Sequence, residues 1–345
     1  MHRHNPYPRG VYAVTISTPS PTRVLAGLLL LLAGGCQPSG GYKITPVPAD
    51  RSLDESVVLD EGGWVPPKVA LIDLDGILIN AKRGGLLTEG ENPVSLTVEQ
   101  LDQAAGDRQV KAVLLRLNSP GGSVGASDAI YQEVRGFRQR TGKPVVAMMM
   151  DVAASGAYYI ACGCDEIVAQ RTTITGSIGV VMQTFDVSGT MAKLGIHSDA
   201  IVSGPKKDAG SPLRPMTPEE RRVFQDLVDT FYAQFLEVVR TGRPKLAELD
   251  DAALRTIADG RVYHADKALE LGLIDRIGTI REAVAAAKQR AQLDRVRVVS
   301  YHRPLGWKPN LYAAAPPAGP TINLLKVDWP AWLRPAPQFL YLWTP

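Results

Sequence analysis

Residues 145–162 decide the fold and read Val145-Val-Ala-Met-Met-Met-Asp-Val-Ala-Ala-Ser155-Gly-Ala-Tyr-Tyr-Ile-Ala-Cys162. The first six residues are apolar and predict a buried strand, and the residues from Gly156 onward predict a short helix. Ser155 lies at the junction between the two. The unpaired N–H groups at a helix start stabilise nearby negative charge, so Ser155 is a candidate nucleophile. A serine at such a junction is also a common helix N-cap.

Further strands and helices alternate on both sides of this stretch. Strands are expected at residues 69–74, 112–117, 167–169 and 179–182. Helices are expected at residues 101–105, 126–137, 217–242, 252–257 and 280–290, the third of them opened by the capping box Thr217-Pro-Glu-Glu220. This alternation predicts an α/β fold, with a mostly parallel sheet covered by helices and a helical C-terminal part.

Two other strand ends carry glycines and hydroxyl groups. In Asn118-Ser-Pro-Gly121-Gly122-Ser123, the paired glycines allow backbone N–H groups to point into a cleft and to hold an oxyanion. Thr175-Gly-Ser177-Ile-Gly precedes the strand at 179–182. Each segment alone is typical of a tight turn, but sites form at the carboxyl ends of parallel strands.

A second serine competes with Ser155 for the role of nucleophile. Gly121-Gly-Ser123-Val-Gly125 matches the G-x-S-x-G nucleophile elbow and lies between a strand and a helix, as that motif requires. The alternative function is therefore an α/β-hydrolase-type esterase that uses Ser123 with a His/Asp pair.

A nucleophilic serine needs a base, and the sequence offers two kinds. His197, His264 and His302 follow the leader, and none has a recognisable catalytic context. Lys206 and Lys207 lie in a loop after an apolar segment. A lysine acts as a base when burial lowers its pKa from about 10.4 towards 7–8. A Lys-Lys pair by itself is usually a solvated surface charge.

The first 35 residues have the pattern of a secretory signal. They carry Arg3, Arg9 and Arg23, no acidic residue, and an apolar run from Val24 to Ala33 that is too short to span a bilayer. We expect a signal peptide at 1–35 and keep an uncleaved N-terminal anchor as the alternative. The protein would then be exported.

Cys36 follows Leu32-Ala-Gly-Gly and resembles the lipid-bearing cysteine of a bacterial lipoprotein processing box. Lipidation at Cys36 would tether the protein to a membrane, whereas a plain cleaved signal would leave this cysteine without a role. Residues 36–67 are rich in Pro and Gly and are expected to be a linker. Residues 68–300 would form the enzymatic domain, and residues 301–345 a Pro- and Trp-rich tail.

Composition excludes several classes of protein. The chain has 345 residues, 45% of them apolar, which is enough for a large core. It has 38 Lys and Arg against 35 Asp and Glu, and three of the basic residues lie in the leader. The remainder is formally neutral, so nucleic acid is not expected as a partner. No second Cys/His pair lies at metal-ligand spacing from Cys162 and Cys164, so no metal site is expected. Both cysteines should instead be small buried residues on a helix.

Together these segments resemble the signal peptide peptidase A family in its short form, bacterial serine peptidases of the ClpP/crotonase fold. The resemblance covers most of residues 68–280. It rests on six segments in order: Leu74-Asp-Gly-Ile, Arg116-Leu-Asn-Ser-Pro-Gly-Gly, Ala154-Ser-Gly-Ala-Tyr-Tyr-Ile-Ala, Thr175-Gly-Ser-Ile-Gly-Val, Ser203-Gly-Pro-Lys-Lys-Asp with Ser211-Pro212, and Gly260-Arg-Val-Tyr with Gly272-Leu-Ile-Asp. One departure is Ala157, where the family usually has a second glycine.

The resemblance implies a role for each matching residue. Ser155 would be the nucleophile and Lys207, rather than Lys206, its base. Ser177 would orient the lysine, and the glycines Gly121 and Gly122 would line the oxyanion hole together with Gly156.

It also implies acyl transfer on apolar peptides, such as cleaved signal peptides near the extracytoplasmic (periplasmic) face of a bacterial membrane, without a cofactor. Short-form relatives assemble into homo-oligomeric rings, so a ring is implied. The third candidate function is a non-catalytic crotonase-fold scaffold that binds peptides or partners. The combination of Ser155, Ser177 and Lys207 argues against it.

Overall fold

The computed structural model describes residues 52–81, 91–303, 311 and 339–343. The expected signal peptide, Cys36 and much of the expected linker and tail lie outside these residues. Among the described residues, no helix is both long enough and apolar enough to cross a membrane.

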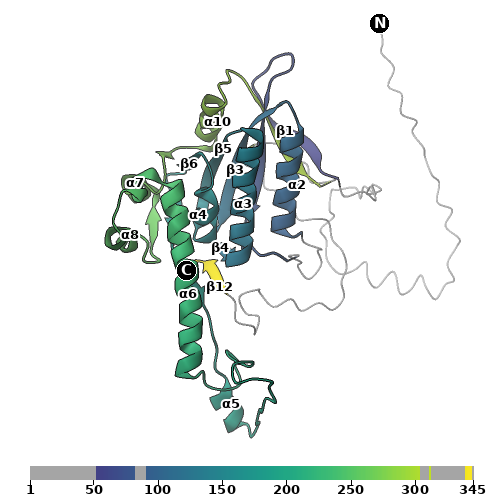
Figure 1. The fold of residues 1–345 in the computed structure, drawn as a ribbon. Coiled ribbons are helices and arrows are strands. Elements are labelled where there is room, and N and C mark those ends of the chain that lie inside the picture. The colour runs from purple at the N-terminus through teal and green to yellow at the C-terminus, as the bar shows by residue number, and fades with distance from the viewer. Residues whose placement is uncertain (1–51, 82–90, 304–310, 312–338, 344–345) are drawn as a thin grey trace, which may run out of the picture. The chain divides into compact units, whose positions relative to one another are not determined.

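The described residues form a nine-stranded sheet in the order β1-β11-β2-β3-β5-β6-β10, with β7 pairing β5 and β9 pairing β7 (Figure 1). Six of its pairings are parallel, and those of β1 with β11 and of β7 with β9 are antiparallel. The predicted α/β fold with a mostly parallel sheet is therefore confirmed. The strands are β1 Asp54–Asp60, β2 Lys68–Asp75, β3 Val110–Ser119, β5 Val145–Ala154, β6 Glu166–Ala169, β7 Ile174–Gly176, β9 Val262–His264, β10 Arg276–Ile277 and β11 Arg297–His302.

Helices cover both faces of the sheet because the central strands are apolar on both sides. Ile72 of β2 and Leu115 of β3 pack with Ile130 of α3 on one face. Their neighbours Leu71 and Leu114 pack with α10 on the other face. The helices are α2 Pro93–Gly106, α3 Val124–Thr141, α4 Gly156–Ala161, α5 Ser188–Lys193, α6 Pro218–Gly242, α7 Pro244–Ala247, α8 Asp251–Ile257, α9 Ala265–Glu270 and α10 Ile280–Arg290.

Three strand ends meet at one edge of the sheet. Ser119 at the end of β3 pairs with Ala153 of β5, and Ala154 at the end of β5 pairs with Gly176 at the end of β7. Because these pairings are parallel, the segments that follow the strands emerge side by side. The three segments singled out in the sequence are therefore brought together.

The structure adds two strands where the sequence indicated a linker and a tail. Residues 54–60, within the expected linker, form β1 because Val57 and Leu59 pair with Val299 and Val298 of β11. Residues 339–342, within the expected tail, form β12. Strand β12 lies between β4 (Gly121–Ser123) and β8 (Val181–Met182) in a second, three-stranded sheet, and both of its pairings are antiparallel.

Helix α6 has two dissimilar halves. Its capping box is formed as predicted, with Thr217 and Glu220 bonding each other's backbone amides. Near its C-terminus Phe235 and Val239 are buried in the core, whereas Val223 and Leu227 in the first half are exposed. The helix has 25 residues and so is about 37 Å long. Figure 1 shows it running from the sheet to the segment that carries α5.

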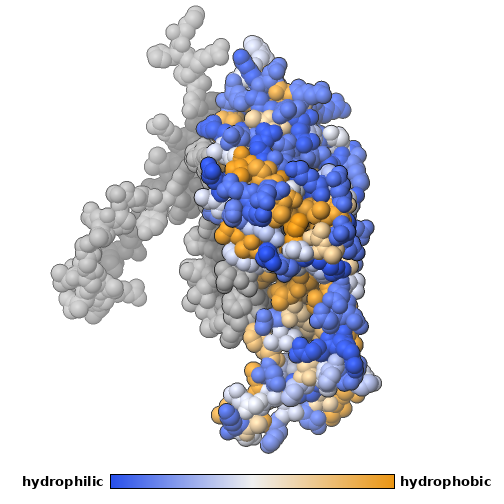
Figure 2. All heavy atoms as spheres, turned by 90° about the vertical axis from the view of Figure 1, so that its left-hand side faces the viewer, coloured by the Kyte–Doolittle hydropathy of each residue, from blue (hydrophilic) through white to orange (hydrophobic). Residues whose placement is uncertain are grey.

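Exposed apolar side chains are concentrated in residues 181–227, here called the arm. Ten of the thirteen large apolar side chains that are exposed in the described part of the chain belong to it. In Figure 2 the lower part of the molecule, where α5 lies in Figure 1, carries scattered hydrophobic side chains among hydrophilic ones. The ten are Val181, Phe185, Val187, Leu194, Ile196, Ile201, Val202, Leu213, Val223 and Leu227.

Candidate active site

Ser155 has a strained backbone and a hydroxyl group that does not cap the helix. Its φ and ψ are 53° and −115°, a combination that residues other than glycine rarely adopt. Its amide donates to the carbonyl of Gly176 at 2.8 Å, and its carbonyl accepts from the amide of Tyr159 at 2.9 Å. These bonds hold the strained turn on both sides. Ser155 is only 1% exposed and occupies the N-cap position of α4 without a side-chain capping bond.

Ser123 differs from Ser155 on each of these points. Its φ of −68° and ψ of 146° are ordinary extended values, and its hydroxyl accepts a bond from the amide of Ala126 at 3.3 Å as the N-cap of α3. A nucleophile elbow requires a sharp, strained turn that presents a free hydroxyl. That geometry is found at Ser155, at the end of β5, and not in the segment that matches G-x-S-x-G.

Gly121, Gly122 and Gly156, here called the glycine cluster, bring backbone amides together beside Ser155. A Cβ atom built on Gly121, whose φ is 102°, would lie 2.7 Å from the nitrogen of Gly156. One built on Gly156 would lie 3.2 Å from the nitrogen of Gly122 and would overlap the hydroxyl of Ser127. Only residues without side chains fit here. The backbone nitrogens of Gly122 and Gly156 therefore lie close to each other beside Ser155.

Leu78 holds the glycine cluster from the other side. Its amide donates to the carbonyl of Gly121 and its carbonyl accepts from the amide of Ser123, both at 2.8 Å. A Cβ atom on Gly122 would overlap this Leu78 backbone. Leu78 closes the segment Leu74-Asp-Gly-Ile-Leu78, and sequence reasoning assigned it no role. Both hydrogen bonds involve only its backbone, so neither its side-chain type nor its spacing from a motif could have revealed them.

Ser177 lies next to Ser155, since the residues before them, Ala154 and Gly176, are paired. It too has a positive φ, of 49°, and is buried. Its amide donates to the carbonyl of Arg261 at 2.8 Å, which fixes the turn after β7. Among the described residues, Ser155, Ser177 and Gln292 are the non-glycine residues with positive φ. Two of these three lie in the candidate site.

The three histidines in the described part of the chain are not hydrogen-bonded to any residue of the candidate site. The imidazole of His302 is hydrogen-bonded to the hydroxyl of Ser56 at 2.6 Å, which joins β11 to β1. His264 accepts a bond from the amide of Lys267 as the N-cap of α9. His197 is exposed in the arm. None of these contacts involves Ser155, Ser177 or the glycine cluster.

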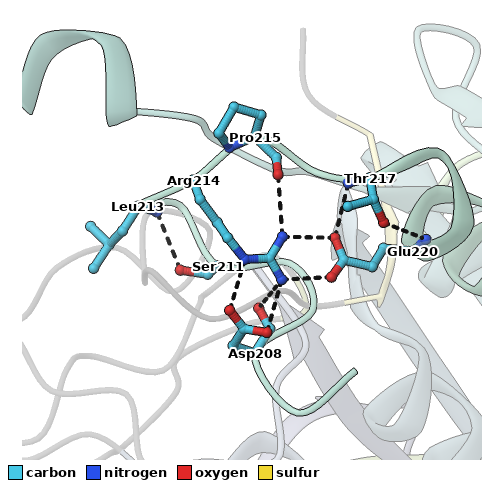
Figure 3. Close-up of polar contacts among 7 residues, drawn as sticks. All are labelled: Asp208, Ser211, Leu213, Arg214, Pro215, Thr217 and Glu220. Atoms are coloured by element: carbon cyan, nitrogen blue, oxygen red, sulfur yellow. Dashed lines mark hydrogen bonds and ion pairs between the residues drawn. The ribbon is translucent and has the colours of Figure 1, made fainter. Parts of the chain in front are cut away.

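Lys207 belongs to a loop that an ion-pair network holds against the start of α6 (Figure 3). The guanidinium group of Arg214 contacts the carboxylate of Asp208 at 2.7 Å and that of Glu220 at 2.6 Å. Hydrogen bonds from the Arg214 side chain and from the Thr217 amide lower the pKa of Glu220 to about 2. Hydrogen bonding by Arg214 also lowers the pKa of Asp208. The Asp208 carboxylate is thus directed to Arg214. Lys207 is exposed and has no ion pair within the described part of the chain.

In a single chain, α6 keeps this loop away from Ser155. The ring of Phe235 packs against the ring of Tyr159 in α4, with 5.1 Å between the centroids. Glu220 precedes Phe235 by fifteen residues on the same helix, which corresponds to about 22 Å along its axis. Lys207 is connected to Glu220 through Asp208 and Arg214. The structure therefore gathers Ser155, Ser177 and the glycine cluster, while Lys207 lies at the far end of α6.

Cys162 and Cys164 are free and buried, as expected, but the prediction that they belong to a helix is wrong, because α4 ends at Ala161. Burial raises the pKa of the Cys162 thiol to about 12, so it stays protonated. Among the described residues, no group of His, Cys, Asp and Glu side chains is arranged to hold a metal ion.

Comparison with known proteins matches residues 138–294 to the model of peptidase family S49. The chain is 34% identical over 241 residues to a putative signal peptide peptidase SppA of Enterococcus faecium, covering 70% of this chain and 69% of that protein. It is 37% identical over 227 residues to a putative protease of Synechocystis sp., covering 66% of this chain and 76% of that protein. A solved mutant of the 1510-N membrane-bound stomatin-specific protease matches 64% of this chain and 84% of its own, with 17% identity and a TM-score of 0.39.

Proposed function

The chain belongs to peptidase family S49 and is a serine-type peptidase with a ClpP/crotonase-like fold, and we propose that Ser155 and Lys207 form its catalytic dyad. The observation that carries this proposal is the strained turn at Ser155 beside the glycine cluster. It presents a buried hydroxyl at a helix start, within reach of two amide donors. This is the arrangement that acyl transfer needs.

The proposed reaction uses these groups in sequence. Neutral Lys207 accepts the proton of the Ser155 hydroxyl, and the serine oxygen attacks a peptide carbonyl. The amides of Gly122 and Gly156 donate hydrogen bonds to the resulting oxyanion. The amine product leaves with a proton from the lysine, and water then hydrolyses the acyl-enzyme with Lys207 again as the base. Ser177, adjacent to Ser155, orients the lysine amine.

We propose that the lysine comes from a neighbouring copy in a homo-oligomeric ring. Two features support this assignment. The length of α6 separates Lys207 from Ser155 of the same chain. The arm that carries Lys207 also exposes ten large apolar side chains, which a second copy would cover. Burial at such an interface would also remove water from the lysine, as a neutral amine requires.

The proposed substrates are apolar peptides such as cleaved signal peptides, held near a membrane. The relative from Enterococcus faecium is named a putative signal peptide peptidase, which supports this substrate class. Export by the leader and a tether at Cys36, or a retained N-terminal segment, would place the protein on the extracytoplasmic face of a bacterial membrane. If Cys36 carries the lipid, Cys36→Ser should move the protein from the membrane fraction to the soluble fraction or leave its leader uncleaved.

Mixing two inactive variants tests the shared dyad. Ser155→Ala and Lys207→Ala should each lack activity on an apolar fluorogenic peptide. When the two are co-expressed, some interfaces pair an intact Ser155 with an intact Lys207, so part of the activity should return. Lys206→Ala, one residue away and equally exposed, is the matched control and should stay active. No recovery in verified mixed oligomers would exclude a base from the neighbouring copy. Full activity of Lys207→Ala would exclude the dyad itself.

A further inference from the structure

The segment Gly272-Leu-Ile-Asp275, one of those that resemble the peptidase family, has no part in the proposed reaction. It lies between α9 and β10 and accepts hydrogen bonds from two helices. The hydroxyl of Tyr158 in α4 donates to the carbonyl of Leu273 at 3.0 Å. Arg243, at the C-terminal end of α6, donates from its Nε atom to the carbonyl of Gly272 at 2.9 Å. The helix that begins beside the nucleophile and the helix that leads to the arm are therefore bonded to the same four residues.

The guanidinium group of Arg243 is buried and makes directed bonds to Asp275. Its two terminal nitrogens donate to the two carboxylate oxygens of Asp275 at 2.8 and 2.7 Å. The amide of Ile167 in β6 donates to the same carboxylate at 2.8 Å, and the amide of Asp275 donates to the carbonyl of Ile167 at 2.9 Å. A planar guanidinium joined to a carboxylate by two bonds fixes orientation as well as distance. Arg243 therefore fixes the end of α6 to the main sheet.

The preceding residue, Gly242, fixes the distance between α6 and α4. A Cβ atom built on Gly242 would overlap the carbonyl oxygen of Cys162, the C-cap residue of α4. Figure 1 shows the end of α6 beside α4. The close approach of the two backbones and the bonds of Arg243 together hold the end of α6 in one orientation.

Helix α6 leaves the core about half-way along its length. The hydroxyl of Tyr232 donates to the carbonyl of Ala258 at 2.6 Å, whereas Leu227, five residues earlier, is exposed. Arg243 lies eleven residues after Tyr232 and Glu220 twelve residues before it, which are about 16 and 18 Å along the axis. With Tyr232 as the pivot, a displacement of about 1 Å at Arg243 would move Glu220 by about the same amount in the opposite direction.

We infer that Arg243 is a positioning residue for the proposed base, Lys207, and that Asp275 is the partner that holds it. This inference rests on the proposed function, in which Lys207 acts on Ser155 of a neighbouring copy. Arg243 touches neither the substrate nor the reacting atoms. It acts through α6, whose first turn carries the ion pair of Glu220 with Arg214 and hence the Lys207 loop. A catalytic group misplaced by about 1 Å can lose about 10²-fold in rate.

Steady-state kinetics on an apolar fluorogenic peptide give the first readout. Arg243→Lys keeps the charge but loses the two-bond fork to Asp275, so kcat should fall on the order of 100-fold while KM changes little. Asp275→Asn removes the charge from the other side of the pair and should lower kcat in the same direction. Far-ultraviolet circular dichroism should be unchanged in both. Two variants keep the test valid if one of them fails to fold.

Arg240→Lys is the matched control, because it makes the same substitution one turn earlier in the same helix. Arg240 contacts Asp251 at 2.7 Å and the carbonyl of Leu249 at 2.9 Å, and its hydrogen-bond partners lie in residues 247–251. Its replacement leaves the bonds to residues 272–275 in place. The kcat of Arg240→Lys should therefore stay close to that of the wild-type enzyme.

Mixed oligomers separate the positioning of the base from a general structural role. A Ser155→Ala chain supplies only the lysine, and a Lys207→Ala chain supplies only the serine. Arg243→Lys added to the Ser155→Ala chain should lower the recovered activity on the order of 100-fold. The same substitution added to the Lys207→Ala chain should leave most of it, because Ser155 is held by the pairing of β5 with β7 rather than by α6.

The possible failures are distinct. Equal losses in the two arrangements would reveal a structural role alone and would overturn this inference. A loss confined to the chain that supplies the serine would also overturn it, since Arg243 would then act through α4. Unchanged kcat in both Arg243→Lys and Asp275→Asn would do the same. No recovery when Ser155→Ala and Lys207→Ala are mixed without a further substitution would instead remove the shared dyad, on which the inference rests.

Discussion

The amide of Ser155 donates a hydrogen bond of 2.8 Å to the carbonyl oxygen of Gly176, the residue before Ser177. This bond continues the parallel ladder between β5 and β7 by one step, into the turns where both strands end. The two serines are therefore positioned by the same sheet edge. Neither depends on a flexible loop for its place in the candidate site.

Replacing each candidate nucleophile should give opposite results. Ser155→Ala should lower peptidase activity by about 10⁴-fold or more, as loss of a nucleophile does. Ser123→Ala removes an N-cap bond, so it should cost about 1 kcal/mol of stability and retain most of the activity. A fluorophosphonate probe, located by peptide mapping, should label Ser155. Labelling at Ser123 would instead support the esterase with a His/Asp pair.

Adding one methyl group to the glycine cluster should disable catalysis. The Cβ atom of Gly156→Ala would overlap the hydroxyl of Ser127, which should displace the backbone that carries the proposed oxyanion donor. We expect kcat to fall by roughly 10²–10³-fold with KM less affected. Gly125→Ala is the matched control, because nothing lies within 4 Å of its added Cβ atom. The double variant Gly156→Ala, Ser127→Ala should regain part of the activity if the overlap is the cause.

Removing Arg214 should disturb the Lys207 loop without disturbing the sheet. Arg214→Leu leaves the carboxylates of Asp208 and Glu220 without their shared partner. Activity should fall on the order of 100-fold, the scale of a misplaced catalytic group. The far-ultraviolet circular dichroism should change little. Arg222→Leu removes only an exposed pair with Glu219 and should remain active. Equal activity of the two variants would mean that the network does not position Lys207.

The same network should make the arm sensitive to acid. The pKa of Glu220 falls from 4.5 to about 2 in the folded protein, mainly because Arg214 donates to its carboxylate. A carboxylate with a lowered pKa stabilises the fold above its unfolded pKa, and this contribution is lost as the pH falls. Pepsin should therefore cleave residues 183–217 increasingly fast as the pH falls from 4.5 towards 2. Glu220→Gln should already be sensitive at pH 4.5, and a flat wild-type profile would contradict the assignment.

The sequence was sufficient to predict the core and the strand-to-helix junction at Ser155 because both depend on local patterns. The apolar run Val145–Met150 and the small residues around Ser155 specify a buried strand and a tight helix start wherever they lie in the sheet. The helix at Ile280–Arg290 and the capping box of α6 match the structure for the same reason. Each of these signals is confined to a few neighbouring residues.

The remaining features depend on partners that are distant in sequence. Strand β1 forms because Val57 pairs with Val299, and β12 forms because Tyr341 pairs with Gly122. Only the second segment, Phe339-Leu-Tyr-Leu342, is an apolar and aromatic run, and its sequence does not indicate which strand it pairs with. The distance between Lys207 and Ser155 likewise follows from the angle at which α6 leaves the core. No local motif encodes that angle. The sequence therefore indicated Lys207 as the candidate base without indicating where it lies in the fold.

The dissimilar halves of α6 have a consequence for how the enzyme responds to dilution. With Ser155 at one end of the helix and Lys207 beyond the other, the proposed shared dyad would place catalysis at an interface between copies, so that activity would follow mass action. Specific activity should then fall as the protein is diluted, even at saturating substrate. Under the proposed shared dyad, a single chain would be inactive, and proteolysis would begin only once enough copies had assembled.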